Sequence, residues 1–198
     1  IEDIRGRLCF MTSREKAWLI RDKYSGDKDA DLTEDLARLK KGEPMDYVIG
    51  WSDFLGCRIE LETRPLIPRA ETEFWTEKVI SEINTISCSY EQDMVKDKTI
   101  KCLDIFAGSG SVGIAVLKHC PQATVDFAEK SAKFCQQIKA NCEHNDIDPK
   151  RYRIFQANIF NPLGRRAFKW GKYNLILANP PYVPEGRKLN KSVVDWEP

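Results

Sequence analysis

A short turn near the end of the chain is rich in hydrogen-bond acceptors. The run L-I-L-A-N-P-P-Y (Leu175–Tyr182) leads an apolar, strand-like segment directly into an asparagine, two prolines and a tyrosine. Because proline has no backbone N–H, the turn offers acceptors and few donors. Asn179 and Pro180 would each accept one N–H of a planar NH2 group and stabilise the positive charge that develops when its nitrogen attacks an electrophile. We therefore expect Asn179, Pro180 and Tyr182 to be catalytic and, with Pro181, to bind the substrate.

A glycine-rich loop follows the first expected strand of the C-terminal half. Gly108, Gly110 and Gly113 satisfy the pattern G-x-G-x-x-G, and Glu129 follows at the spacing of a ribose-binding acid. This pattern alone is typical of dinucleotide binding. Asp104, however, ends the preceding strand, where it would repel a pyrophosphate and attract the ammonium of a methionyl group. These residues favour S-adenosylmethionine as the cofactor, with both ribose hydroxyls bound by Glu129.

The composition argues against several classes of protein. With 31 Lys and Arg against 30 Asp and Glu, the net charge is +1, so the overall charge does not indicate binding to nucleic acid or to a membrane surface. No apolar run is long enough to span a bilayer and the first residues form no signal peptide, so we expect a cytoplasmic protein. Seven cysteines without a C-x-x-C pair, and only two histidines, indicate reduced thiols and no metal site.

The first half of the chain has mixed patterns. Thr33 is expected to cap a helix that Gly42 ends, and the β-type pattern that begins at Tyr47–Ile49 predicts a hairpin. The expected elements are helices within 1–42, a hairpin over 47–62, a helix over 71–86 and a polar linker over 87–98.

From Thr99 onward, strands and helices alternate. Strands are expected over 100–105, 124–128, 152–156 and 173–178, with helices over 112–119 and 132–144 between them. This rhythm predicts a parallel sheet with right-handed crossovers. Ligands of such sheets bind beyond the carboxyl ends of the strands, where Asp104, Glu129, Asn158 and Asn179 all fall.

Several motifs, in chain order, resemble one family. Lys40–Gly50 reads K-K-G-E-P-M-D-Y-V-I-G, Leu66–Glu73 reads L-I-P-R-A-E-T-E, Ala157–Leu163 reads A-N-I-F-N-P-L and Val193–Pro198 reads V-V-D-W-E-P. Together with D-I-F-A-G-S-G and N-P-P-Y, they resemble the HemK/PrmC methyltransferases, which modify the glutamine of the Gly-Gly-Gln motif in peptide chain release factors. The resemblance implies an α/β, Rossmann-like class I methyltransferase that uses S-adenosylmethionine and acts as a monomer on release factors.

The resemblance also implies a division of the chain into three parts. A helical substrate-recognition domain over 1–46 is expected to be joined by a hairpin, helix and linker over 47–98 to a methyltransferase domain over 99–198. The family's sheet has seven strands, whereas four are expected here before Pro198. We therefore expect both ends of the chain to be cut, with the C-terminal part of the sheet missing and a sheet edge exposed.

The site residues that the resemblance implies lie in the loops at the strand ends. Pro68 and Arg69 are expected beside the substrate. The residues expected to hold the cofactor are Asp104, Phe106, Ala107, Gly108, Ser109, Gly110, Glu129, Lys130, Asn158, Ile159 and Asn179. Departures from the common family pattern are Phe106 in place of glycine, Glu129 and Asn158 in place of aspartate, and Ala70 in place of proline.

Two other functions stay open at this point. N-P-P-Y also occurs in enzymes that methylate an exocyclic amine of adenine or guanine in RNA or DNA, and such a substrate would require salt-sensitive binding of nucleic acid. The glycine pattern alone would also suit a dinucleotide-dependent oxidoreductase. Protection of the fold by S-adenosylmethionine but not by NAD would separate the oxidoreductase from both methyltransferases.

Overall fold

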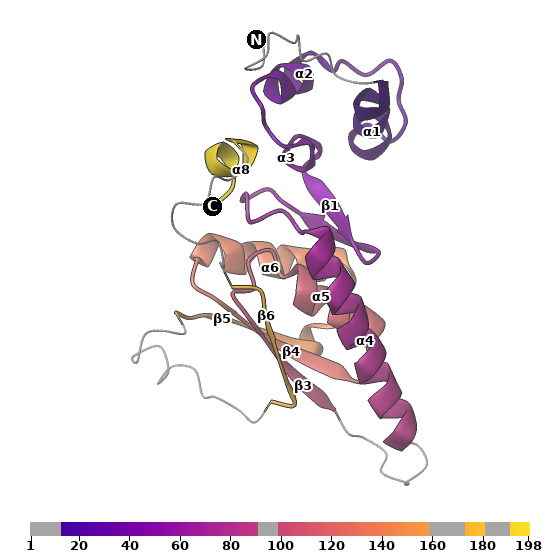
Figure 1. The fold of residues 1–198 in the computed structure, drawn as a ribbon, viewed down its shortest axis with the longest axis vertical. Coiled ribbons are helices and arrows are strands. Elements are labelled where there is room, and N and C mark those ends of the chain that lie inside the picture. The colour runs from indigo at the N-terminus through magenta and orange to yellow at the C-terminus, as the bar shows by residue number, and fades with distance from the viewer. Residues whose placement is uncertain (1–12, 91–98, 159–172, 181–190) are drawn as a thin grey trace.

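The computed structural model describes residues 13–90, 99–158, 173–180 and 191–198, with the backbone alone for 86–90 and 191. Figure 1 shows the N-terminal helices and a hairpin at one end of the molecule and a larger sheet with its helices at the other. The N-terminal elements are α1 (Ser13–Lys23), α2 (Thr33–Lys40), α3 (Met45–Ile49), β1 (Trp51–Phe54) and β2 (Cys57–Glu60). The later elements are α4 (Ala70–Tyr90), β3 (Ile100–Ile105), α5 (Ser111–His119), β4 (Ala123–Glu129), α6 (Ala132–His144), η2 (Pro149–Arg151), β5 (Tyr152–Gln156), β6 (Leu175–Ala178) and α8 (Lys191–Trp196).

Four parallel strands form the larger sheet, in the order β5-β4-β3-β6. Ile105 of β3 is paired with Ala128 of β4 and with Ala178 of β6, so these three strands end at the same edge. This order, with α5 and α6 in the crossovers, confirms the predicted Rossmann-like α/β fold. The residues that follow β3 and β6 are therefore neighbours in space.

The main core lies where α5 packs on the sheet. The helix is buried from Ser111 to Leu117. At Gly113, a Cβ atom would lie 2.3 Å from Cε1 of Phe127 and 2.9 Å from Cγ1 of Val125, both in β4. Only glycine therefore lets the helix approach the sheet this closely. This contact sets the position of α5, and of the loop before it, against β4.

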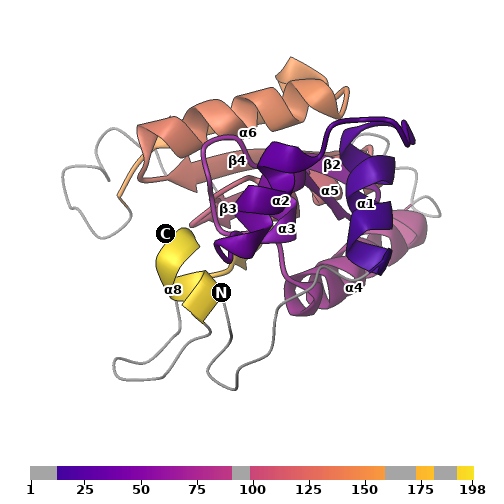
Figure 2. The same cartoon turned by 90° about the horizontal axis from the view of Figure 1, so that it is seen from above.

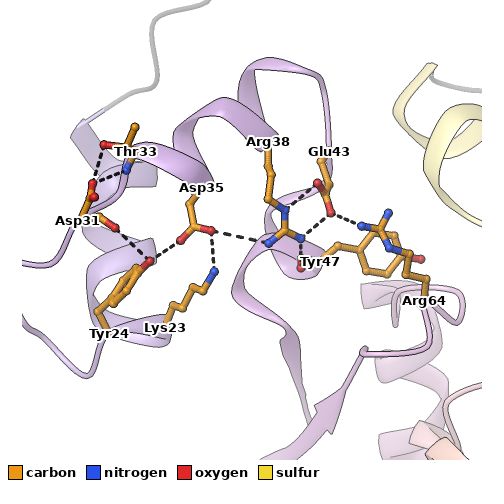
Figure 3. A network of polar contacts seen from close by, with 9 residues as sticks. All are labelled: Lys23, Tyr24, Asp31, Thr33, Asp35, Arg38, Glu43, Tyr47 and Arg64. Carbon is orange, nitrogen blue, oxygen red and sulfur yellow. Dashed lines mark hydrogen bonds and ion pairs between the residues drawn. The ribbon is translucent and has the colours of Figure 1, made fainter.

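Ion pairs around two buried carboxylates join the N-terminal helices to the segment that leads into α4 (Figure 3). Asp35 of α2 accepts a hydrogen bond from Lys23 of α1 at 2.6 Å and lies 3.7 Å from the guanidinium of Arg38. Arg38 binds both carboxylate oxygens of Glu43, at 2.9 and 2.6 Å, and Arg64 binds the same carboxylate at 2.6 Å. The Asp35 and Glu43 side chains are each 3% exposed, so breaking their ion pairs would leave a buried charge without a partner. The pairs therefore hold the helices in place relative to residue 64.

Two expectations for the N-terminal part are wrong. Tyr47–Ile49, expected in a strand, form α3, because Pro44 precedes the first turn and Gly50 ends the helix with a left-handed φ of +99°. Burial of two side chains of this helix outweighs their β propensity. Thr33 does not cap α2: the N-cap is Leu32, and the Thr33 hydroxyl donates to the Asp31 carboxylate at 2.6 Å.

The other boundaries differ less. The hairpin is confirmed, with its turn at Leu55–Gly56, where φ is +51° and +74°. Helix α4 continues to Tyr90, so residues 87–90 are helical rather than part of a linker. The predicted fourth strand begins two residues late, because Asn174 instead exchanges hydrogen bonds with the backbone of Lys101.

Candidate functional site

A cleft opens at the carboxyl ends of β3 and β6. It brings together three predicted groups of residues: the glycine-rich loop, Asn179 and the pair Pro68 and Arg69. Its lining residues are Leu66, Ile67, Pro68, Arg69, Thr72, Asp104, Phe106, Ala107, Gly108, Ser109, Ser111, Val112 and Asn179.

The loop between β3 and α5 has an unusual backbone. Phe106, Gly108 and Gly110 have φ values of +59°, +56° and +82°, all in the left-handed region. Phe106 occupies a position where the resembling family usually has glycine, and its positive φ gives the reason, since a side chain costs about 1 kcal/mol in this conformation. The loop is closed by the N–H of Gly110, which donates to the carbonyl of Ala107 at 2.7 Å.

Asp104 is a buried acid at the edge of the cleft. The residue is 3% exposed, and its carboxylate accepts the N–H of Gly113 at 3.0 Å. Burial raises the pKa of this carboxyl to about 7; the Gly113 hydrogen bond opposes the rise and the charge of Glu129 adds to it. Within the described part of the chain Asp104 has no ion pair with a basic side chain. The cleft wall therefore presents an acid that a bound cation would stabilise.

Glu129 lies behind the loop rather than in the lining of the cleft. Its two carboxylate oxygens accept the backbone N–H groups of Gly108, at 2.9 Å, and of Ser131, at 2.8 Å. Each oxygen keeps a second lone pair, so the carboxylate can brace the loop and still accept another donor. Lys130 is exposed and Asn158 is half-buried, and neither belongs to the described cleft lining.

Asn179 is held by Thr72, which was not among the predicted site residues. Its side-chain nitrogen donates to Oγ1 of Thr72 at 3.3 Å. Thr72 is 4% exposed and lies in the first turn of α4, inside the motif L-I-P-R-A-E-T-E. This contact leaves the Asn179 side-chain oxygen as the acceptor at the cleft. Pro180 is exposed.

Three predicted site residues, Ile159, Pro181 and Tyr182, lie outside the described residues. The proposed packing of the Tyr182 ring on a substrate amide therefore stays a prediction.

Arg69 is engaged by a carboxylate from the C-terminal end of the chain. Its guanidinium lies 2.5 and 2.6 Å from the two oxygens of Glu197, and the N–H of Ile67 donates to the same carboxylate at 3.3 Å. The Glu197 side chain is 2% exposed. Figure 2 shows α8, which directly precedes Glu197, on the same side of the molecule as α2 and α3. Glu197 was missed although it belongs to the motif V-V-D-W-E-P.

The remaining reactive side chains give no second site. The described cysteines, which are Cys57, Cys102, Cys120, Cys135 and Cys142, are all unpaired. Burial raises the pKa of Cys57 to about 11 and that of Cys142 to about 12, so both are poor nucleophiles. Across the described ranges no three His, Cys, Asp or Glu side chains gather as metal ligands.

Among the helices of the described residues, none combines the length and the apolar character that crossing a bilayer requires.

Comparison with known proteins gives a consistent set of matches. Residues 88–195 match the family described as "Methyltransferase small domain". The chain is 31% identical to the release factor glutamine methyltransferase of Flavobacterium psychrophilum, over 82% of this chain and 53% of that protein. It is 27% identical to the protein of the same name from Lactococcus lactis, over 91% of this chain and 60% of that protein. The chain thus spans between half and two thirds of the length of these relatives, and the matches confirm the resemblance predicted from the motifs.

Solved structures with similar coordinates include a SAM-dependent methyltransferase from Agrobacterium tumefaciens, with 18% identity, a TM-score of 0.45 and coverage of 57% of this chain and 32% of that one. The N-terminal domain of human METTL16 in complex with SAH has 16% identity and a TM-score of 0.45, covering 95% of this chain and 61% of that one.

Proposed function

The chain belongs to the methyltransferase small domain family, and from this premise we propose that it transfers a methyl group from S-adenosylmethionine to the side-chain amide nitrogen of a glutamine. The glutamine is the one in the Gly-Gly-Gln motif of peptide chain release factors. One observation carries the proposal: a single cleft contains a buried acid, Asp104, that has no ion pair among the described residues, and an amide acceptor, Asn179, at the ends of two paired strands. The first suits a cationic cofactor and the second an NH2 substrate.

The cleft residues fit S-adenosylmethionine in charge and in space. Asp104 would bind the amino group of the methionyl part, since a cation next to this acid offsets the cost of its buried charge. At Gly108, which lines the cleft, the positive φ lets the backbone turn without a side chain between it and the ligand. Glu129 would use its remaining lone pairs for the ribose hydroxyls. When bound, the cofactor supplies an electrophilic methyl carbon on a sulfonium sulfur.

The acceptor side of the reaction depends on Asn179. An amide nitrogen is a weak nucleophile because its lone pair is delocalised, so it gains most from being held in one orientation. The Asn179 oxygen and the Pro180 carbonyl would each accept one N–H of the substrate and stabilise the charge that forms on nitrogen. Thr72 keeps the Asn179 amide group in the orientation that turns its oxygen to the substrate. The proton becomes acidic only as the methyl group arrives, so no separate general base is required.

The choice of substrate rests on the names of the relatives and on the N-terminal helices. Both relatives described above carry the name release factor glutamine methyltransferase. The ion pairs from Asp35 to Arg64 hold the helices next to the segment that becomes the cleft wall, so a protein bound to the helices would lie close to the cleft. We propose that this helical part binds the release factor. A monomeric state and a cytoplasmic location stay predictions.

The test uses methyl-labelled S-adenosylmethionine with release factors, each as wild type and with the Gly-Gly-Gln glutamine changed to alanine, followed by peptide mass mapping. We expect label on the wild-type glutamine, none on the alanine variant, and strong loss of labelling with the enzyme variant Asn179→Ala. Label on RNA or DNA and none on the release factor would contradict the proposed substrate. Failure of the chain to bind the cofactor would contradict the proposed reaction as a whole.

A further inference from the structure

Helix α6 pairs with the outer edge of the hairpin as if it were a third strand. Asn145 accepts the N–H of Arg58 at 3.0 Å and donates to its carbonyl at 2.7 Å. Asn141 accepts the N–H of Glu60 at 2.9 Å and donates to its carbonyl at 3.3 Å. The side chains of these two asparagines thus satisfy both polar groups of two alternate residues of β2, an edge strand with unpaired backbone groups.

The spacing of the helix matches that of the strand. Residues 141 and 145 are one helical turn apart, a rise of about 6 Å, and residues 58 and 60 lie about 6.7 Å apart along a strand. Gln137, one turn earlier on the same face, accepts the N–H of Thr63 at 3.0 Å. Two amides of α6 and that of its C-cap residue, Asn145, therefore hold the hairpin and the segment after it in one register against the methyltransferase sheet.

Asn141, unlike Asn145, also bonds to the glycine-rich loop. Its side-chain nitrogen also donates to the backbone carbonyl of Ser109, at 2.9 Å. Ser109 lies in the glycine-rich loop and lines the cleft. Asn141 is 0% exposed, so no water can replace its amide group without a change in packing. One side chain therefore joins the hairpin edge directly to the loop that would hold the cofactor.

We propose that Asn141 is a positioning residue for the cofactor site: it sets the glycine-rich loop through the Ser109 carbonyl and couples this loop to the hairpin and thus to the N-terminal helices. This inference rests on the proposed use of S-adenosylmethionine. Its consequence is that the hairpin and the cofactor loop shift together, so the Asn141 amide is one route by which an event at the helices reaches the loop. Asn145 contributes to attaching the hairpin but makes no contact with the loop.

This difference provides a matched pair of variants. Asn145→Ala removes two hydrogen bonds to the hairpin edge and one to the Asn141 carbonyl. Asn141→Ala removes two bonds to the hairpin edge, one from Gln137 and the bond to Ser109. Asn141→Asp is a second variant of nearly the same shape, which keeps the acceptor for the Glu60 N–H and lacks the donor for the Ser109 and Glu60 carbonyls. The readouts are the dissociation constant of S-adenosylhomocysteine by calorimetry and the hydrogen exchange of the Gly108 and Gly110 amides without ligand.

We expect Asn145→Ala to bind S-adenosylhomocysteine within twofold of the wild type, and Asn141→Ala and Asn141→Asp to bind at least tenfold more weakly. The loop amides should exchange at least tenfold faster in the two Asn141 variants than in Asn145→Ala. Equal affinity and equal exchange in the Asn141 and Asn145 variants would overturn the inference. If the wild type binds no S-adenosylhomocysteine, the proposed cofactor is wrong, and the exchange comparison still decides whether Asn141 positions the loop. If Asn141→Ala does not fold, Asn141→Asp alone is compared with Asn145→Ala.

Discussion

Replacing Asp104 by asparagine is expected to stabilise the ligand-free chain while weakening its affinity for the cofactor. The residue is 3% exposed, and burial raises the pKa of the carboxyl from its ordinary 3.8 to about 7. At pH 7.5 the buried charge therefore costs about 4 kcal/mol of stability. Asparagine removes the charge and its oxygen can still accept the Gly113 N–H, but its NH2 group costs about 1–3 kcal/mol if it finds no partner. The expected net gain is about 1–3 kcal/mol.

The stability difference between Asp104→Asn and the wild type should depend on pH. Because the folded-state pKa of Asp104 lies above the value in the unfolded chain, the folded chain holds a proton between about pH 4 and pH 7 that the unfolded chain has released. The contribution of this group to stability thus falls as the pH rises through that window. Asp104→Asn has no such dependence, so its advantage over the wild type should grow from pH 5 to pH 7.5 by roughly 3 kcal/mol.

Urea unfolding at pH 5 and pH 7.5, with calorimetric binding of S-adenosylhomocysteine at pH 7.5, tests both parts. The expected loss of affinity is about tenfold to hundredfold, as for removal of a charged hydrogen-bond partner. Asp126→Asn is the matched control: this buried acid is paired with Arg153 and Tyr173, so its loss should lower stability and leave ligand affinity unchanged. An Asp104→Asn chain that is less stable than the wild type at pH 7.5, or one that keeps full affinity, would refute the reasoning.

Three further substitutions test the packing around the site. Glu43→Gln should lower the free energy of unfolding by about 2–3 kcal/mol at pH 7, because it leaves two arginines facing a neutral group. The Arg38 hydrogen bond lowers the pKa of Glu43, so the stability that its charge contributes is lost as the pH falls through that lowered value. Urea unfolding should therefore show the difference in stability between variant and wild type shrinking below about pH 4. Gly113→Ala should lower the unfolding free energy by about 3 kcal/mol, since its Cβ would lie 2.3 Å from a ring atom of Phe127, and an unchanged urea midpoint would contradict this. Thr72→Val should lower kcat for methyl transfer about tenfold with an unchanged dissociation constant for S-adenosylhomocysteine, since it frees only the Asn179 amide; equal losses in both would show that Thr72 acts on the cofactor side instead.

The sheet and its ligand-binding edge could be predicted because the relevant signals are local. Ile100–Ile105 and Tyr152–Gln156 are predicted with the bounds they have, since each is a short β-type run between turn residues. Asp104 and Asn179 could be assigned to one cleft because parallel strands end at a common edge. Tyr47–Ile49 was assigned wrongly because the β propensity of its residues was weighed, whereas the residues that bound its helix, Pro44 before it and Gly50 after it, were not.

The contacts that complete the cleft could not be predicted from spacing. Thr72 and Asn179 are 107 residues apart, and Arg69 and Glu197 are 128 residues apart. No local pattern encodes such a pair: a threonine in a first helical turn or a glutamate near a tryptophan is compatible with an exposed position. Only the folded chain shows that both pairs anchor one short stretch of backbone.

That stretch, residues 66–72, connects the two halves of the proposed reaction. It forms one wall of the cleft, and through Thr72 it holds the amide group that would accept the substrate. Its other end is held by Glu197, through Arg69 and the N–H of Ile67. A shift of this wall would therefore change the position of the substrate acceptor and the width of the cofactor cleft together, which ties catalysis to the packing of the chain around Glu197.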